Sequence, residues 1–320
     1  MKKINKAITG IDKSGSFRVY MAVTTKLVED ARLIHETSPL ATHLLGRTLT
    51  GAGLMGLMMR EPGFKLTLQL KGEGPAQQVL CTASSDGAVK GYIANPKVEL
   101  PAKADGSPDV GGALGLGVLT CIRDTGLKEP YVGRIDFVSG EVADDLTAYF
   151  FISEQQQTSV SLGVRLADDG SVEAAGGMIL QVLPDASEEA ISALEEWLPK
   201  MPKITELVCG AAGVGHLSGS ETEEISAEAQ AERLLKAAFS GMPEDFEVTA
   251  LDMPDIGWEC DCSEERLEQV VLSLGAKEIR NIIEEDGQAE LTCQFCRRKY
   301  HFDKSHLERL LYEGIRQKLN

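Results

Sequence analysis

Two close pairs of cysteines near the C-terminus constrain this chain more than any other feature. Cys260 and Cys262 are separated by one residue, and after thirty further residues Cys293 and Cys296 are separated by two. Four thiols in two such pairs can supply the tetrahedral sulfur shell that zinc prefers. The spacing therefore predicts one zinc ion per chain, bound by these four cysteines in a small C-terminal domain.

The sequence around the cysteines indicates how they converge. Residues 288–292 and 297–302 have the pattern of two short strands, with the second cysteine pair in the turn between them, and Ser263 and Ser305 are expected to begin flanking helices. Bound zinc contributes about 10–16 kcal/mol to the folding of a small domain, whereas a whole domain is stable by only about 5–15 kcal/mol. Oxidation of the thiols would remove the metal ligands, so this domain is then expected to unfold. Spacing alone leaves a permanent structural zinc site open beside a redox-sensitive one.

The overall charge argues against several classes of partner. The 320 residues carry 49 acidic and 32 basic side chains, a formal net charge of −17. Such a surface repels phosphate groups, so neither nucleic acid nor an anionic membrane is an expected partner. The basic start of the chain reaches Asp12 without an apolar stretch, and the longest uncharged stretch, residues 48–59, is shorter than the roughly 20 residues that span a bilayer. We expect a soluble, cytoplasmic protein whose seven cysteines serve metal or redox chemistry rather than a disulfide scaffold.

The acidic residues are concentrated in the middle of the chain and mark its predicted boundaries. Residues 184–257 carry 16 acidic and only 4 basic side chains. We predict an α+β core domain over residues 1–183, an acidic helical linker over 184–257 and a zinc-binding domain over 258–320.

Two amphipathic helices are predicted within the acidic segment. One begins at Ser187 and ends before Pro199, and the other runs from Ser226 to Phe239. The glycine-rich residues 210–215 between them are expected to be flexible. Short helices with a narrow apolar stripe are marginal alone, so these helices are expected to dock beside the zinc-binding domain and to depend on it.

The first 183 residues mix helix and strand patterns. Ser38 and Pro39 predict the start of a helix that continues towards Met59. Strict alternation of apolar residues predicts a strand over residues 64–70. Further strands are expected at 76–84, 88–94, 160–166 and 178–183. Clustered strands with few intervening helices indicate an α+β fold.

The cysteine segments also carry a resemblance to a known family. Cys260-Asp-Cys262, Glu284-Glu-Asp-Gly287, Cys293-Gln-Phe-Cys296 and Tyr300-His-Phe302 resemble the redox-switch domain of the thirty-three-kilodalton chaperonin family, which are bacterial redox-regulated heat-shock holdases. The likeness continues upstream, so that it covers nearly the whole chain. The upstream segments are Leu45-Gly-Arg-Thr-Leu-Thr50, Gly91-Tyr-Ile-Ala-Asn-Pro96, Val138-Ser-Gly-Glu141 and Ala174-Ala-Gly-Gly177.

This resemblance implies a function and a mechanism. It implies a substrate-binding α+β core, an acidic linker and a zinc-binding switch in which Cys260, Cys262, Cys293 and Cys296 hold the metal while the protein is reduced and inactive. Oxidation would join Cys260 to Cys262 and Cys293 to Cys296 as disulfides, release zinc and unfold the switch and linker. The resulting dimers would hold unfolding client proteins without ATP during heat or oxidative stress.

Other readings of the cysteine region remain open from the residues alone. Arg297-Arg-Lys299 would suit a zinc ribbon that binds nucleic acid, and Cys293 with Cys296 would suit a thiol oxidoreductase. His301 and His306 could replace a sulfur ligand, although four sulfurs already complete the shell. We find no catalytic constellation in the linear spacing and do not expect an enzyme.

Two further patterns are assigned to packing. Gly51-Ala-Gly-Leu-Met-Gly56 matches the dinucleotide-binding pattern literally, but it lies inside a helical pattern rather than after a strand, so it is interpreted as close helix packing. Cys81, Cys121 and Cys209 are scattered, and we interpret them as core or linker residues.

Overall fold

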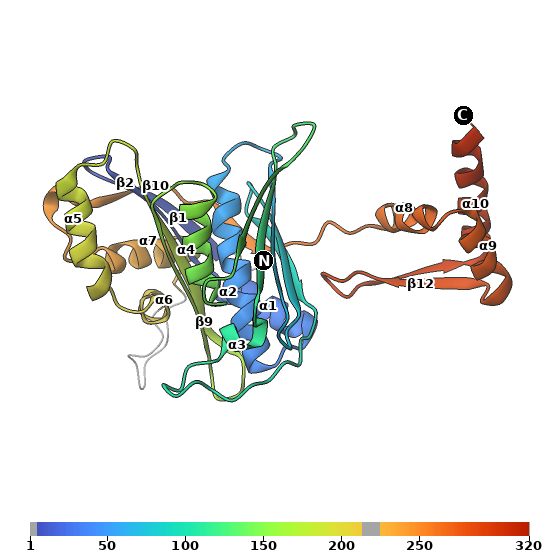
Figure 1. Cartoon of the computed structure of the whole chain (residues 1–320), viewed down its shortest axis with the longest axis horizontal. Coiled ribbons are helices and arrows are strands. Elements are labelled where there is room, and N and C mark those ends of the chain that lie inside the picture. Colours follow the sequence, from blue (N-terminus) through green and yellow to red (C-terminus); the bar gives the residue numbers. More distant parts are fainter. Residues whose placement is uncertain (1–4, 213–224, 320) are drawn as a thin grey trace. The chain divides into compact units, whose positions relative to one another are not determined.

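The structure is a computed structural model that describes residues 5–212 and 225–319, with side chains of the last helix described as far as Glu313. The chain forms two compact units, Met1–Glu259 and Cys260–Asn320 (Figure 1). Both units combine helices and strands, in agreement with the predicted mixed fold. The three-part functional division into residues 1–183, 184–257 and 258–320 stays a prediction.

The first unit is built on one eleven-stranded sheet. All neighbouring strands are antiparallel except β11 and β5, which are parallel. In spatial order the strands are β7 (Tyr131–Asp136), β6 (Gly117–Asp124), β3 (Lys65–Gly72), β4 (Gln78–Ser84), β5 (Ala88–Ile93), β11 (Asp255–Trp258), β1 (Asn5–Asp12), β2 (Phe17–Val23), β9 (Val172–Val182) and β8 (Thr158–Leu166), while β10 (Val248–Asp252) also pairs with β1.

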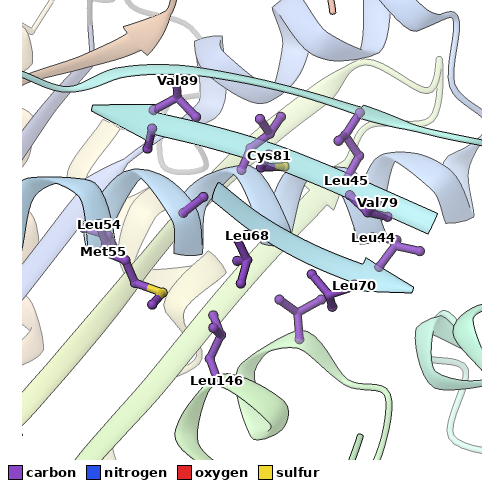
Figure 2. Close-up of a cluster of buried hydrophobic side chains, with 14 of the residues drawn as sticks. Leu44, Leu45, Leu54, Met55, Leu68, Leu70, Val79, Cys81, Val89 and Leu146 are labelled. Atoms are coloured by element: carbon purple, nitrogen blue, oxygen red, sulfur yellow. The ribbon is translucent and has the colours of Figure 1, made fainter. Parts of the chain in front are cut away.

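Outside the acidic segment, the helices that pack against the sheet are α1 (Thr25–His35), α2 (Pro39–Met58), α3 (Val110–Leu114) and α4 (Val142–Ile152). Helix α2 begins as predicted, because the Ser38 hydroxyl accepts a hydrogen bond from the backbone N–H of Ala41. It contacts β3, β4 and β5 as well as β2, β8 and β9, so both halves of the sheet pack on one buried helix. Figure 2 shows this core, in which leucines of α2 meet Leu68, Leu70 and Cys81 of the strands.

The glycine pattern inside α2 serves packing, which confirms the interpretation from the sequence. A Cβ atom at Gly53 would lie 2.7 Å from Cδ1 of Ile256, and one at Gly51 would lie 2.7 Å from Cδ1 of Leu146. Glycine therefore lets the helix approach its neighbours more closely than any other residue would allow. The pattern lies within a helix, not after a strand, so it does not form a dinucleotide-binding turn.

The acidic middle segment is part of the first unit and packs on its sheet. Its helices are α5 (Glu188–Trp197), the short η1 (Leu198–Lys200), α6 (Ile204–Ala212), α7 (Ala227–Ala238) and the short η2 (Glu244–Phe246). Their apolar side chains share one buried cluster with residues of β1, β2 and β9. The ring of Phe239 stacks on Trp197 at 4.6 Å and on Phe17 of the sheet at 6.1 Å. The helices thus have a packing partner in the sheet that the sequence did not predict, and their dependence on the zinc-binding domain stays a prediction.

The two predicted helices of this segment are confirmed, with Ser187 and Ser226 as their N-terminal caps. The expected flexibility of residues 210–215 is wrong in part, because residues 210–212 complete α6. Helix α6 buries Leu207 and Val208 in the same cluster, and this packing outweighs the local glycine. Residues 213–215 lie outside the described part of the chain.

The second unit contains α8 (Glu264–Leu274), α9 (Ala276–Glu285), β12 (Gln288–Thr292), β13 (Lys299–Asp303) and α10 (Lys304–Leu319). Its core is small, with Phe302 and four aliphatic side chains buried between the helices and the hairpin. Ser263 caps α8 as predicted. Strand β13 begins two residues later than predicted, because Arg297 takes a left-handed conformation with φ 58° and belongs to the turn. Helix α10 begins at Lys304, and the Asp303 carboxylate accepts the backbone N–H of His306.

A half-buried histidine makes the stability of the first unit depend on pH. Burial, together with the nearby Arg47 cation, lowers the pKa of His43 in α2 to about 4. The unfolded chain takes up this proton near pH 6.5, so the stability that His43 contributes is present above pH 6.5 and is lost as the pH falls towards 4. From about 1.4 kcal/mol per pKa unit, His43 should account for at most about 2 kcal/mol lost between pH 7 and pH 5.

The test compares urea unfolding of the wild type and His43→Gln at both pH values. Trp197 and Trp258 are the two tryptophans of the chain and both lie in the first unit, so tryptophan fluorescence reports this unit alone. The variant should show a smaller loss of stability on acidification. Equal losses in both proteins would contradict the assignment.

Candidate metal centre

Four thiols from two separate segments meet in the second unit. Cys260 and Cys262 lie between β11 and α8, and Cys293 and Cys296 lie in the turn between β12 and β13. Their four Sγ atoms are all within 4.8 Å of one another. The shortest distances join the two pairs, with 3.8 Å between the Sγ atoms of Cys260 and Cys293 and 3.3 Å between those of Cys262 and Cys296. The structure therefore brings together all four cysteines that the spacing singled out.

The hairpin turn presents the second pair. Five residue pairs join β12 to β13, ending with Thr292 opposite Lys299. Within the turn, the backbone N–H of Cys293 donates to the carbonyl of Arg298 at 2.9 Å, and the N–H of Arg297 donates back to the carbonyl of Cys293 at 2.9 Å. With Arg297 left-handed, the chain reverses tightly enough for both thiols to reach one centre.

The first pair is held by contacts on both sides. The Arg266 guanidinium donates to the Asp261 carbonyl at 3.0 Å and also pairs with the Asp261 carboxylate. From the hairpin, the Tyr300 hydroxyl donates to both the carbonyl oxygen and the Sγ of Cys262, at 3.2 Å each. Tyr300 thereby links the two cysteine segments beside the thiols themselves.

The four thiols differ in how readily they lose a proton. Burial opposes ionisation of Cys262, but hydrogen bonds from Tyr300 and the neighbouring thiols outweigh burial and lower its pKa to about 7. Burial raises the pKa of Cys260 well above its usual value. The group therefore stabilises one thiolate by hydrogen bonds from its neighbours, and a bound cation would stabilise the others.

The geometry suits a soft, tetrahedral metal ion. The sulfur separations exceed the disulfide bond length of about 2.05 Å, so these cysteines are free thiols here. Zinc–sulfur bonds of about 2.3 Å in a tetrahedron place the sulfurs roughly 3.8 Å apart. This separation lies within the range of Sγ–Sγ distances in the cluster, from 3.3 Å to at most 4.8 Å. The cluster could hold a metal ion with little rearrangement.

The histidines considered as substitute ligands bind elsewhere. Nε2 of His301 lies 3.0 Å from the Glu290 carboxylate, and Nε2 of His306 lies 2.6 Å from that of Glu268. Lys299 of the basic triplet also pairs with Glu290, at 2.8 Å. Glu290 of β12 thus pairs with both Lys299 and His301 of β13 on the surface of the hairpin.

The remaining cysteines are buried in the first unit, as interpreted from the sequence. Burial raises the pKa of Cys81 well above its usual value and that of Cys121 to about 11, so both thiols stay protonated. The Sγ of Cys209 accepts a hydrogen bond from the Arg165 guanidinium at 2.6 Å.

Sequence reasoning missed a second group of metal-ligating type, formed by Glu264, Glu268 and His306. The signal was the four-residue spacing of the two glutamates, which places them on one face of α8. Arg309 already contributes a positive charge there, with its guanidinium 2.7 Å from Glu268. This group joins α8 to α10 through side-chain contacts.

Comparisons with known proteins agree with one another. The sequence matches the family described as Hsp33 protein over residues 5–303. It is 41% identical to the 33 kDa chaperonin of Alkaliphilus oremlandii over 99% of both chains, and 42% identical to that of Clostridioides difficile over 94% of this chain and 96% of the relative. The crystal structure of the 33 kDa chaperonin (heat shock protein 33 homolog) of Thermotoga maritima superposes with a TM-score of 0.81 at 33% identity, covering 98% of this chain and 99% of that one. Within the described residues, none of the helices combines the length and apolarity needed to cross a bilayer.

Proposed function

Because this chain belongs to the Hsp33 protein family of chaperones, we propose that it holds unfolding proteins without ATP and that a zinc-bound cysteine centre switches this activity. In the reduced, inactive state Cys260, Cys262, Cys293 and Cys296 bind one zinc ion per chain. The observation that carries the proposal is the convergence of four thiol sulfurs within 4.8 Å.

The zinc ion matters because the second unit has little else to stabilise it. Among the side chains described up to Glu313, five hydrophobic ones are fully buried in its core, from Val271 to Leu310. A unit of this size rarely gains more than about 3–5 kcal/mol from its core, whereas structural zinc contributes about 10–16 kcal/mol. The metal thus decides whether residues 260–320 are folded.

Oxidation removes the ligand set. Hydrogen peroxide takes two electrons from each cysteine pair, so Cys260–Cys262 and Cys293–Cys296 become disulfides while two peroxide molecules and four protons become four waters. The four sulfurs then carry no thiolate charge for the metal, and Zn²⁺ leaves. Disulfides that close loops of one and two residues constrain the unfolded chain little, so the switch unfolds.

We assign the functional parts accordingly. Residues 1–183 form the substrate-binding core, 184–257 the acidic linker and 258–320 the redox switch, and the linker loosens with the switch. The partners are unfolding client proteins and, after oxidation, a second copy of the chain, in the cytoplasm and without a catalysed reaction.

The experiment compares reduced, zinc-loaded protein with protein treated with hydrogen peroxide at mild heat. Oxidation should release about one zinc per chain, consume the four clustered thiols and turn an inactive protein into one that suppresses light scattering by a denaturing test protein. Cys209→Ser, which alters a cysteine outside the cluster, should behave like the wild type. Equal suppression by the reduced, zinc-loaded protein would refute the switch.

A further inference from the structure

One short strand joins the two halves of the large sheet. On one side of β11 lie β5, β4, β3, β6 and β7, and on the other lie β1, β2, β9 and β8. Strand β11 has only four residues, Asp255–Trp258, and contributes two residue pairs to each neighbour. Only Glu259 separates its end from Cys260, the first cysteine of the centre. The strand that completes the sheet is therefore next in the chain to the redox-sensitive unit.

The slot that β11 fills, between β5 and β1, is shaped for an extended backbone. The carbonyls of Gly87 and Val89 accept the N–H groups of Gly257 and Glu259 at 3.0 and 2.9 Å, and the N–H of Ala7 donates to the carbonyl of Pro254 at 2.9 Å. At Gly87, with φ +86°, a Cβ would lie only 1.9 Å from the Asp255 carbonyl oxygen, so the two backbones are in direct contact.

Two side chains of β11, Ile256 and Trp258, pack on the core of the first unit. Ile256 is fully buried, in the space left by Gly53 of α2. A Cβ at Gly257, by contrast, would meet no atom within 4 Å. The slot therefore takes an apolar side chain at the position of Ile256 and leaves the position of Gly257 open to side chains of other sizes.

Surface ion pairs of Lys6 link β11 to helix α7 of the acidic segment. The Lys6 ammonium lies 2.7 Å from the carboxylate of Asp255 and 3.5 Å from that of Glu228 on α7. Asp255 and Glu228 are both about half exposed, so this link is weak. Loosening of α7 and departure of β11 would each remove one of the two carboxylates from Lys6.

We propose that β11 is a removable plug, and that the slot between β5 and β1 is a binding site for extended apolar segments of non-native proteins. This inference rests on the proposed chaperone function and names the surface it uses. When residues 260–320 unfold, β11 loses its folded neighbour in the chain and leaves the sheet. A client segment then pairs its backbone with Gly87, Val89 and Ala7, and inserts one apolar side chain where Ile256 was. Strand addition of this kind binds by main-chain hydrogen bonds and tolerates many sequences, as a holdase requires.

The first test opens the slot without oxidation. Ile256→Asp places a charge in an apolar site and should expel β11, so the reduced, zinc-loaded variant should suppress aggregation of a denaturing test protein. Leu251→Asp makes the same change on β10, where the side chain is 55% exposed, and should stay as inactive as the reduced wild type. Zinc content should be unchanged in both variants. An inactive, folded Ile256→Asp protein would overturn the proposal.

The second test uses the wild type and does not depend on the folding of a variant. Hydrogen exchange at the Ala7 amide should become at least about tenfold faster after oxidation and slow again when client is bound. The Leu68 amide, in a strand paired on both sides, should not respond. A synthetic peptide of residues 252–259 should compete with client for the oxidised protein, whereas the same peptide with Asp in place of Ile256 should not.

The outcomes separate the two proposals. If the oxidised wild type fails to suppress aggregation, the chaperone switch is refuted. If it suppresses aggregation while Ala7 stays protected, or while the peptide does not compete, the slot assignment alone is refuted. The Ala7 amide of oxidised protein could also become protected again, without client, as the protein concentration rises. That result would show that a second copy of the chain occupies the slot instead of a client.

Discussion

Replacing Cys293 with serine should leave residues 260–320 unfolded at neutral pH even in fully reduced protein. Cys293 is the most buried of the four clustered cysteines, with 8% of its surface exposed, and its Sγ lies 3.8 Å from that of Cys260. Serine is a poor zinc ligand, so the variant loses a large share of the roughly 10–16 kcal/mol that zinc supplies. The small core of this unit, in which Val271, Phe302 and Leu307 are buried, cannot compensate for that loss.

The measurement is zinc affinity by chelator competition, together with amide NMR of the second unit. Gln294→Ser is the matched control, because it introduces serine at an exposed position of the same turn and leaves every sulfur in place. The control should retain zinc and its folded spectrum. Unchanged zinc affinity in Cys293→Ser would remove this residue from the ligand set, and a folded, zinc-free second unit would contradict the role assigned to the metal.

Replacing Leu234 with alanine should release the acidic helices while the zinc centre stays intact. Leu234 is fully buried where α7 packs on the sheet, in the cluster that contains Trp197 and Phe239. Removing such a side chain costs about 2–5 kcal/mol, a large fraction of what docks a twelve-residue helix. The variant should need less oxidant for full chaperone activity, because part of the linker is already loose.

Hydrogen exchange of α7 and the urea midpoint of tryptophan fluorescence measure this release. Lys236→Ala, on the exposed face of the same helix, should match the wild type in both measurements. Identical protection of α7 in the Leu234 and Lys236 variants would contradict the packing role of Leu234. Zinc loss from the Leu234 variant would show that the helices and the metal centre are not separable.

The parts of the structure set by local pattern could be predicted from the sequence. The cysteine spacing led to the cluster because each pair reaches one centre from a single turn. Alternation led to β3, in which Leu66, Leu68 and Leu70 are all buried on one face. Serine caps led to the helices that begin after Ser38 and Ser187.

The parts held by distant partners were not visible in the sequence. Strand β11 has one fully buried apolar side chain in four residues, which is too little for a recognisable strand pattern. It forms a strand because its backbone pairs with β5 on one side and β1 on the other. Glycine signals a break, which led to the prediction of flexibility at residues 210–215, whereas residues 210–212 complete α6. Val208 of this helix packs against Gly176 of β9 and holds the helix in place. Long-range pairing of this kind produces no regular spacing of apolar residues in the sequence.

The outward face of the acidic helices has a consequence for how firmly the resting protein is held together. Helices α5 and α7 adhere to the sheet through apolar side chains, while glutamates such as Glu188, Glu195 and Glu232 point into water. These like charges repel one another, and dissolved ions screen such repulsion over about 10 Å at 0.1 M. At low ionic strength this repulsion acts over a longer distance, so the activation that we propose should need less oxidant than at high ionic strength.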